Sequence, residues 1–231
     1  FSGVGKMDYE ISEALDAKIL QFNVESLAEL ELIANIALNK NLIAPVAIRI
    51  NPNVSAGGHP KISTGKDTDK FGISYLTANK VYSIAKKYKS INVVGIDMHI
   101  GSQITTIEPF EDAFSRITEL YTELTDMGHK IINLDLGGGL GINYQNKLLI
   151  DNNLVKSYGS ILRNVYNKTK ARIIIEPGRF LVGSSGLLVT RIIYKKEELK
   201  KNFLIVDAGM NDFLRPALYS AKHKIKSLKL Y

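Results

Sequence analysis

Short runs of apolar residues, rich in isoleucine and valine, recur along the chain and alternate with longer amphipathic stretches. Parallel strands that are buried on both faces have this nearly continuous apolar character. The pattern predicts five such strands, at residues 19–22, 46–50, 93–99, 131–136 and 173–176.

The clearest helical pattern runs from Pro109 to about Met127, where apolar residues fall at the i, i+3, i+4, i+7 spacing of one helix face. Proline suits the first turn, and Gly128 suits the position just past the end. Similar patterns cover residues 26–38, 77–87 and 154–169. This alternation of strands and helices predicts an α/β fold with a parallel sheet.

Polar and glycine-rich segments follow the predicted strands, at residues 23–26, 51–53, 99–103, 137–139 and 176–179. A (β/α)8 barrel keeps its active site at the carboxyl ends of its strands. A doubly wound sheet places its site there too, so the position of these segments is compatible with both folds.

After Arg179 the pattern changes to predicted strands at 187–194 and 203–207. The segment between them, 195–202, has room only for a turn or a short helical piece. We therefore expect two domains, an α/β domain at residues 1–184 and the start of a β-rich domain at 185–231.

Composition narrows the class of protein. The 231 residues are 45% hydrophobic and 23% charged, as in ordinary globular chains. The absence of cysteine excludes a disulfide scaffold and a thiolate metal site. With no run of 18 apolar residues and no signal-peptide pattern, we expect a cytoplasmic protein that does not span a membrane.

The net charge of +7 comes from scattered basic residues without interleaved aromatic side chains, which indicates a solvated surface and not a nucleic-acid site.

Two motifs resemble nucleotide-binding sequences but depart from them. The segment SGVGK at residues 2–6 is followed by Met7, so the hydroxyl group that a P-loop uses to bind Mg²⁺ is missing. The glycines at 137–141 do not give the G-x-G-x-x-G spacing in any register, which argues against a nicotinamide cofactor. No pair of histidines has metal-ligand spacing, so we expect no metal site.

Each remaining candidate has two interpretations. The three glycines at 137–139 fit an anion cradle made of backbone N–H groups, and they equally fit a tight turn. His99 ends a predicted strand, where histidines are more often packed and hydrogen-bonded than catalytic. Its neighbours Gly101 and Ser102 form a small polar segment that favours a functional role.

Glu176 closes an apolar strand, and Arg179 could clamp an anion or form a structural ion pair with Glu176. Arg215 and Tyr219 have the i, i+4 spacing of one helix face, provided that Pro216 lies in the first turn. A surface turn would explain the same residues.

Taken together, the segments resemble the diaminopimelate decarboxylases and, more widely, the decarboxylases with an alanine-racemase fold that use pyridoxal 5'-phosphate (PLP). The resemblance runs through nearly the whole chain in the motifs FSGVGK, FNVES, RINPN, HPKISTG, KFGIS, HIGSQIT, LDLGGGLGI, IEPGRFLV and VDAGMNDFLRPALY. It implies an incomplete (β/α)8 barrel, followed by the start of a β domain. It also implies the conversion of meso-2,6-diaminopimelate to L-lysine and CO2, a step of lysine biosynthesis.

The resemblance also implies residue roles. Glu176 would bond the pyridine nitrogen of PLP, and a carboxylate there favours decarboxylation because it keeps that nitrogen protonated. His99 would stack on the ring. Ser102, Gly138 and Gly139 would hold the phosphate, and Pro177, Gly178 and Arg179 would line the cofactor. Arg179, Arg215 and Tyr219 would bind the amino-acid substrate.

In such enzymes the lysine that bonds PLP lies on the first barrel strand, and a Cys-Glu-Ser motif lies in the β domain. Neither motif occurs in residues 1–231, so no residue here is assigned as catalytic, and we expect this segment alone to be inactive. We expect a homodimer in the full-length protein. The roles of residues 59–65 and 70–72 stay open.

Three alternatives remain at this stage. One is a related decarboxylase acting on ornithine, arginine or carboxynorspermidine. The second is a PLP-binding protein that is not an enzyme, and the third is a phosphate-binding barrel with unrelated chemistry.

Overall fold

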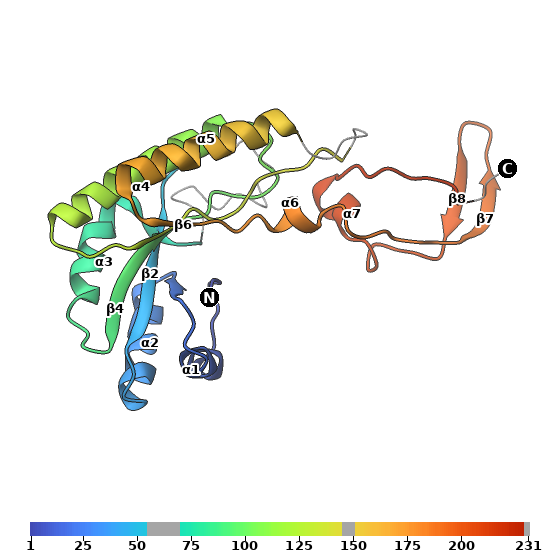
Figure 1. Cartoon of the computed structure of the whole chain (residues 1–231). Helices are drawn as coiled ribbons and strands as arrows, with labels where there is room; N and C mark the ends of the chain where they lie inside the picture. The colour runs from blue at the N-terminus through green and yellow to red at the C-terminus, as the bar shows by residue number, and fades with distance from the viewer. Residues whose placement is uncertain (55–69, 145–150, 229–231) are drawn as a thin grey trace.

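A computed structural model describes residues 1–54, 70–144 and 151–228 of the chain (Figure 1). The HPKISTG motif at 59–65 therefore lies outside the described residues. The elements follow in the order α1 (Asp8–Asp16), β1 (Phe22–Val24), α2 (Leu27–Asn39), β2 (Ala44–Asn51), β3 (Ile73–Ser74), η2 (Tyr75–Thr77), α3 (Ala78–Ala85), β4 (Ile91–Asp97), α4 (Glu108–Asp126), β5 (Asn133–Asp135), α5 (Asn152–Thr169), β6 (Arg172–Ile174), α6 (Gly178–Val182), β7 (Ile192–Glu197), β8 (Asn202–Val206) and α7 (Arg215–Tyr219).

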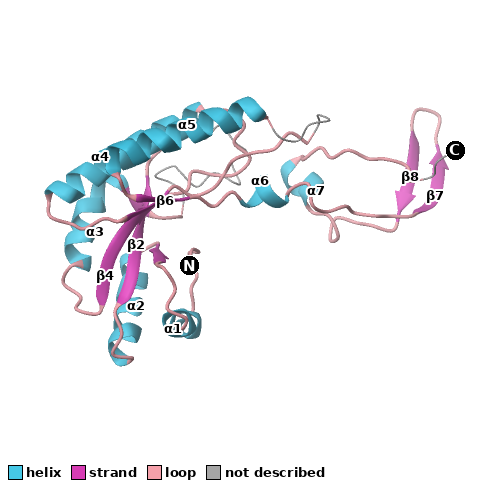
Figure 2. Ribbon diagram, in the orientation of Figure 1, coloured by secondary structure: helices cyan, strands magenta, loops and turns pink. Residues whose placement is uncertain are grey.

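The main sheet has the strand order β1-β2-β4-β5-β6, and the short strand β3 also pairs with β2. Every pairing in it is parallel, which confirms the predicted α/β fold. Because these pairings are parallel, the carboxyl ends of the strands, which Figure 2 draws in magenta, lie at one edge of the sheet. β1 and β6 form the two ends of the strand order.

The first strand lies farther along the chain than its apolar pattern predicts. It spans Phe22–Val24 and not 19–22, and all three of its residues are buried. Asn23 is buried in the middle of this strand because its side chain donates to Asp135, on β5, at 2.9 Å. Leu20, by contrast, is 53% exposed. The pairing of Phe22–Val24 with β2 sets the bounds of this strand, and the hydrogen bond to Asp135 lets the polar Asn23 be buried within it.

Local signals place the helix ends well. At the start of α2, Ser26 accepts a hydrogen bond from the Glu29 N–H at 3.2 Å, which satisfies a donor of the first turn. α4 begins one residue before Pro109, and Gly128 follows its end with a φ of 80° that favours glycine. At α5, the side chain of Asp151 is the cap.

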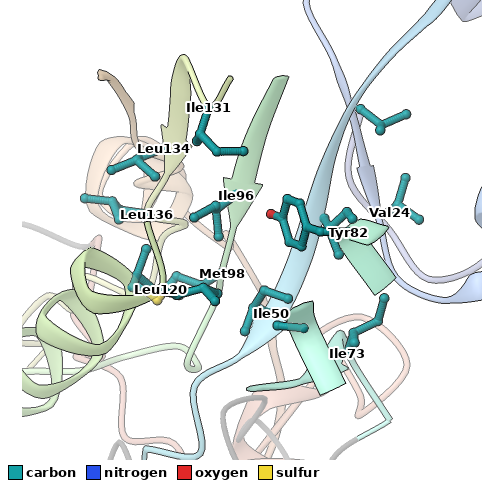
Figure 3. Close-up of a cluster of buried hydrophobic side chains, with 14 of the residues drawn as sticks. Val24, Ile50, Ile73, Tyr82, Ile96, Met98, Leu120, Ile131, Leu134 and Leu136 are labelled. Atoms are coloured by element: carbon teal, nitrogen blue, oxygen red, sulfur yellow. The ribbon is translucent and has the colours of Figure 1, made fainter. Parts of the chain in front are cut away.

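The apolar sides of the helices form one core with the strands, and Figure 3 shows part of it. Ile96, Leu134 and Leu136 of the strand region are fully buried, and Leu120 of α4 is 1% exposed. Tyr82 of α3 is also fully buried, and its hydroxyl satisfies its hydrogen-bonding need by donating to the Gly95 carbonyl at 2.9 Å.

β7 and β8 form a separate antiparallel pair that lies away from the main sheet in Figure 1. β7 begins at Ile192, five residues later than predicted. Its partner β8 ends at Val206, which pairs with Ile192, so residues before 192 have no partner in this strand. Lys195 and Lys196 lie within β7 although they are charged, since all six residues of this strand are exposed.

In the part of the chain that the structure describes, no helix combines the length and the apolar character that crossing a bilayer requires.

Candidate functional site

The segments after β4, β5 and β6 meet at the carboxyl edge of the sheet, as predicted. Gly138 lies between the other two segments: its N–H donates to Nδ1 of His99 at 3.0 Å. A Cβ atom on Gly138 would lie 2.1 Å from the Glu176 carbonyl oxygen. His99 and Glu176 therefore lie at the same end of the sheet, which the barrel interpretation requires.

His99 is held as a neutral ring. Burial lowers the pKa of its imidazole from 6.5 to about 4, and the positive charge of Arg49 acts in the same direction. An unprotonated Nδ1 is also what the Gly138 N–H needs as an acceptor. The side chain is only partly buried, so the ring is both fixed and accessible.

The glycines at 137–139 are required by close approach of backbones. Gly137 has a φ of 63°, and a Cβ there would lie 2.2 Å from the Met98 carbonyl oxygen. Gly139 has a φ of 105°, and its Cβ would lie 2.6 Å from the Gly101 carbonyl oxygen. Any side chain would push the loops after β4 and β5 apart.

The Gly138 N–H is bonded to His99, so in this structure Gly138 also positions the His99 ring. The roles of Gly138 and Gly139 as phosphate ligands stay predictions.

Glu176 is exposed, and its carboxylate accepts a hydrogen bond from the Ser2 hydroxyl at 2.9 Å. The ion pair with Arg179, considered from the sequence, is not formed: within the described residues Arg179 has no carboxylate oxygen within 4 Å. Pro177 is the N-cap of α6, and the Gly178 N–H donates to the Glu176 carbonyl at 2.8 Å, so both shape the turn after Glu176.

Behind Glu176 a chain of polar side chains crosses the sheet. Ser2 accepts from the Asn23 amide at 2.9 Å, and the same amide donates to Asp135 at 2.9 Å. Gln21 joins Asn23 to Asn133 through bonds of 2.8 Å on either side. Five of these polar residues line a cavity of about 340 Å³, which is bounded by Phe1, Ser2, Ile19, Leu20, Gln21, Asn23, Asp135, Ile174 and Glu176.

A second buried cluster lies beside β2. Arg49 donates to Glu25 at 2.6 Å, and Glu25 also accepts from the Gly72 N–H at 2.9 Å. Asp97 lies 3.9 Å from Arg49, and burial, followed by the charge of Asp135, raises the pKa of its carboxyl well above the usual value. A protonated Asp97 is consistent with its buried Oδ1, for which the described residues supply no hydrogen-bond partner. Within the described residues, no group of acids and histidines is arranged to hold a metal ion.

Arg179 links Ser102 to Tyr144. Its Nη2 and Nε donate to the Ser102 hydroxyl at 3.0 and 3.3 Å, and its Nη1 donates to the Tyr144 hydroxyl at 2.9 Å. The predicted cofactor residue Ser102 and the predicted substrate residue Arg179 are therefore in direct contact.

Arg215 and Tyr219 both lie on the short helix α7, so the helix interpretation is confirmed over the surface turn. The guanidinium of Arg215 lies 5.8 Å from the centre of the Tyr219 ring and 5.4 Å from that of Tyr144. Its Nε donates to His223 at 3.4 Å, and the His223 ring packs edge-on against Tyr144 at 4.8 Å. Two of the three predicted substrate residues, Arg179 and Arg215, thus meet at Tyr144, and the third, Tyr219, lies beside Arg215.

Ser2, Tyr144 and His223 were not predicted as site residues. Ser2 belongs to the SGVGK segment, whose Lys6 is buried and donates to the Gly3 and Asn23 carbonyls and to Glu29. These hydrogen bonds give Lys6 a structural role, so the resemblance of the segment to a P-loop requires no bound nucleotide. Tyr144 follows the triple glycine by five residues, and nothing in its local sequence distinguishes it from a packed tyrosine.

The chain is similar in both sequence and fold to known proteins. Diaminopimelate decarboxylase of Aquifex aeolicus is 44% identical over 227 residues, which are 97% of this chain and 53% of that protein. The crystal structure of diaminopimelate decarboxylase from Helicobacter pylori complexed with L-lysine has a TM-score of 0.91 and 42% identity, and covers 98% of this chain and 56% of that one. The enzyme of M. jannaschii in co-complex with L-lysine gives a TM-score of 0.85 at 38% identity, over 95% of this chain and 52% of that one.

The chain spans about half the length of these relatives. The family model described as "Pyridoxal-dependent decarboxylase, pyridoxal binding domain" matches residues 1–183. This match covers the whole parallel sheet and the rim that carries His99, Gly138, Glu176 and Arg179. The chain therefore belongs to the pyridoxal-dependent decarboxylase family, as a member of its pyridoxal-binding domain.

Proposed function

We propose that the protein containing this chain removes CO2 from meso-2,6-diaminopimelate to form L-lysine, with PLP as its cofactor. The observation that carries the proposal is the meeting of Arg179 and Arg215 at Tyr144. Two guanidinium groups beside the cofactor rim suit a substrate with a second carboxylate, which diaminopimelate has. The relatives named above bear the same enzyme name and support the assignment.

The residues of the rim fit PLP. Glu176 is an exposed carboxylate that the Ser2 hydroxyl holds, and its backbone lies beside Gly138 at the same edge of the sheet as His99. His99 offers a neutral, partly exposed ring whose orientation the Gly138 N–H sets. When bound, PLP supplies an electron sink for the electron pair that CO2 leaves behind.

Each of these side chains has a definable task. Glu176 would accept a hydrogen bond from the protonated pyridine nitrogen, and Ser2 holds the carboxylate in place for it. His99 would lie against the ring as a neutral imidazole, which does not compete for that proton. Ser102, Gly138 and Gly139 would hold the phosphate, and Pro177 and Gly178, which shape the turn after Glu176, would line the cofactor.

Arg179 would serve both groups, because its guanidinium already reaches Ser102 on one side and Tyr144 on the other. Arg215 and Tyr219 of α7 would complete the substrate end of the site. The distal ammonium group of ornithine and the distal guanidinium group of arginine are cations, so neither would pair with these two arginines as a second carboxylate does.

Three broader features belong to the same proposal. A domain boundary near residue 184 is supported by the end of α6 at Val182 and by the separate β7–β8 pair that follows. The residues of β7 and β8 are almost all exposed, which suits these strands to further packing within a β domain. We also infer a homodimer and a cytoplasmic location for the full-length enzyme.

The test is a substrate panel on the purified full-length protein. CO2 release should be observed with meso-2,6-diaminopimelate, and bound PLP should be visible by absorbance. The panel includes ornithine, arginine and carboxynorspermidine at matched concentrations. Preference for one of these three would assign the related decarboxylase instead. Bound PLP without CO2 from any substrate would identify a binding protein, and the absence of PLP would refute the cofactor assignment.

A further inference from the structure

Tyr144 is the contact point of a cluster that three distant segments build. Its hydroxyl accepts a hydrogen bond from Arg179 Nη1 at 2.9 Å. The Arg215 guanidinium lies 5.4 Å from the centre of its ring, within the range of a cation–π contact. The ring of His223 packs edge-on against it at 4.8 Å. One phenol therefore uses its polar end for one arginine and its apolar face for the other.

The cluster carries two positive charges that the described part of the chain does not neutralise. The ion pairs among described residues involve lysines 6, 40, 195 and 196 and Arg49, and neither Arg179 nor Arg215 has an acidic oxygen within 4 Å. Such a pair of guanidinium groups is suited to a carboxylate ligand.

His223 adds no third charge. Burial lowers the pKa of its imidazole, and the charges of Arg215 and Arg179 lower it further. The ring is therefore neutral at pH 7, and its Nε2 accepts from Arg215 Nε at 3.4 Å. This contact orients the guanidinium of Arg215 and leaves its other N–H groups for a ligand.

We propose that Tyr144 is a specificity-determining positioning residue, which holds Arg179 and Arg215 at the separation that a substrate's distal carboxylate requires. The inference rests on the proposed function and deepens it by naming the side chain that sets the substrate class. Tyr144 acts through the two arginines, so its loss should weaken carboxylate binding more than the chemical step.

The substitution Tyr144→Phe separates the two contacts, because it keeps the ring under Arg215 and removes the hydroxyl bonded to Arg179. A hydrogen bond to a charged group corresponds to a change on the order of ten-fold or more in binding. We expect the KM for meso-2,6-diaminopimelate to rise about ten-fold in the full-length enzyme, with kcat within about two-fold of the wild-type value.

A second measurement uses ligands that cannot react. Pimelate, a seven-carbon dicarboxylate without amino groups, is titrated by calorimetry against hexanoate, which has one carboxylate. The wild-type protein should prefer pimelate, and Tyr144→Phe should reduce that preference about ten-fold. Tyr166→Phe is the matched control, because Tyr166 is 49% exposed on α5 and its ring, like that of Tyr144, lies close to a basic side chain, that of Lys170.

The outcomes separate the two proposals. Loss of pimelate preference in Tyr144→Phe, with unchanged PLP content, supports the role of Tyr144 even if the wild-type enzyme does not decarboxylate diaminopimelate. Failure of the wild-type enzyme to decarboxylate diaminopimelate would refute only the proposed function. An unchanged preference, an equal loss for hexanoate and pimelate, or a loss of PLP together with the preference would each overturn the specificity role.

Discussion

The hydroxyl of Ser2 donates a hydrogen bond of 2.9 Å to the carboxylate of Glu176, across 174 residues of the chain. Ser2 in turn accepts from Asn23, which also bonds Asp135. The first segment of the chain is thereby joined to the carboxyl ends of β5 and β6. We infer that Ser2 orients the carboxylate that the proposed function assigns to the pyridine nitrogen.

Replacing Ser2 with alanine should remove this orientation without removing the carboxylate. A net loss of about 0.5–1.5 kcal/mol corresponds to a drop in kcat of roughly two- to ten-fold. A shift in the absorbance maximum of bound PLP should accompany it. Ser115→Ala is the control, because Ser115 also bonds a glutamate, Glu119, but on the exposed face of α4. Equal effects of the two variants would argue against an orienting role.

Replacing Glu176 with glutamine should reduce turnover much more than it reduces PLP binding. The amide has nearly the same size but cannot stabilise the pyridinium charge, and one charge-assisted bond corresponds to roughly ten- to a hundred-fold in kcat. Turnover and PLP content of the full-length enzyme are measured together. The matched control is Glu123→Gln on the surface of α4. A normal rate in Glu176→Gln would leave Glu176 with a structural role only.

Lys6 should be essential for stability, because its ammonium group and Glu29 form a buried ion pair with side-chain exposures of 1% and 9%. Lys6→Met leaves Glu29 unpaired and should cost about 3–5 kcal/mol of unfolding free energy. Lys40→Met breaks the exposed pair with Asp16 and should cost only about 0.2–1 kcal/mol. Denaturant unfolding of both variants measures the difference, and similar midpoints would contradict the inference.

A single methyl group on Gly138 should disrupt the rim. Its Cβ would lie 2.1 Å from the Glu176 carbonyl oxygen, so the loops after β5 and β6 must separate. We expect Gly138→Ala to lose bound PLP on dialysis and to unfold at a lower temperature. Gly159→Ala, within α5, meets nothing within 4 Å and should stabilise the helix by about 0.5–1 kcal/mol. Full PLP retention in Gly138→Ala would show that the rim tolerates a wider spacing.

His99 should make the fold sensitive to acid. Its folded pKa of about 4 lies below the unfolded value of 6.5, so the unfolded chain binds more protons between these values. Stability from this group is present above pH 6.5 and is lost as the pH falls toward 4. Asp97 and Asp135 act in the opposite sense, because burial raises the pKa of each carboxyl.

Comparison with His99→Phe isolates the contribution of the histidine. Between pH 7 and pH 4.5, the wild-type protein should lose about 2–3 kcal/mol more unfolding free energy than this variant does. Denaturant titrations at the two pH values provide the measurement. An NMR titration of the His99 ring that gives a pKa near 6.5 would disprove the account.

The local pattern of the sequence was sufficient for much of the fold. The predicted helix at 26–38 corresponds to Leu27–Asn39, and that at 154–169 to Asn152–Thr169. Helix periodicity and capping depend on residues within a few positions of each other, so a single sequence carries them. The parallel order of the strands, and the rim at their carboxyl ends, followed from the alternation of strands and helices.

Tertiary contacts decided what local patterns do not encode. Asn23 is part of β1 because its backbone pairs with β2, and the triple glycine is required by the backbones of Met98, Gly101 and Glu176. In the same way, Arg179 bonds Tyr144 and not Glu176, because Arg179 lies on α6, which follows the turn after β6.

The sequence by itself thus determined the class of fold, the helices and the residue types at the rim, because hydrophobic periodicity is a local property. Only the tertiary structure decided which partners those residues have. Ser2 and Tyr144 became site residues because folding brings them within about 3 Å of Glu176 and Arg179, over separations of 174 and 35 residues. Hydrogen bonds act over such short distances that no spacing along the chain reveals these pairs.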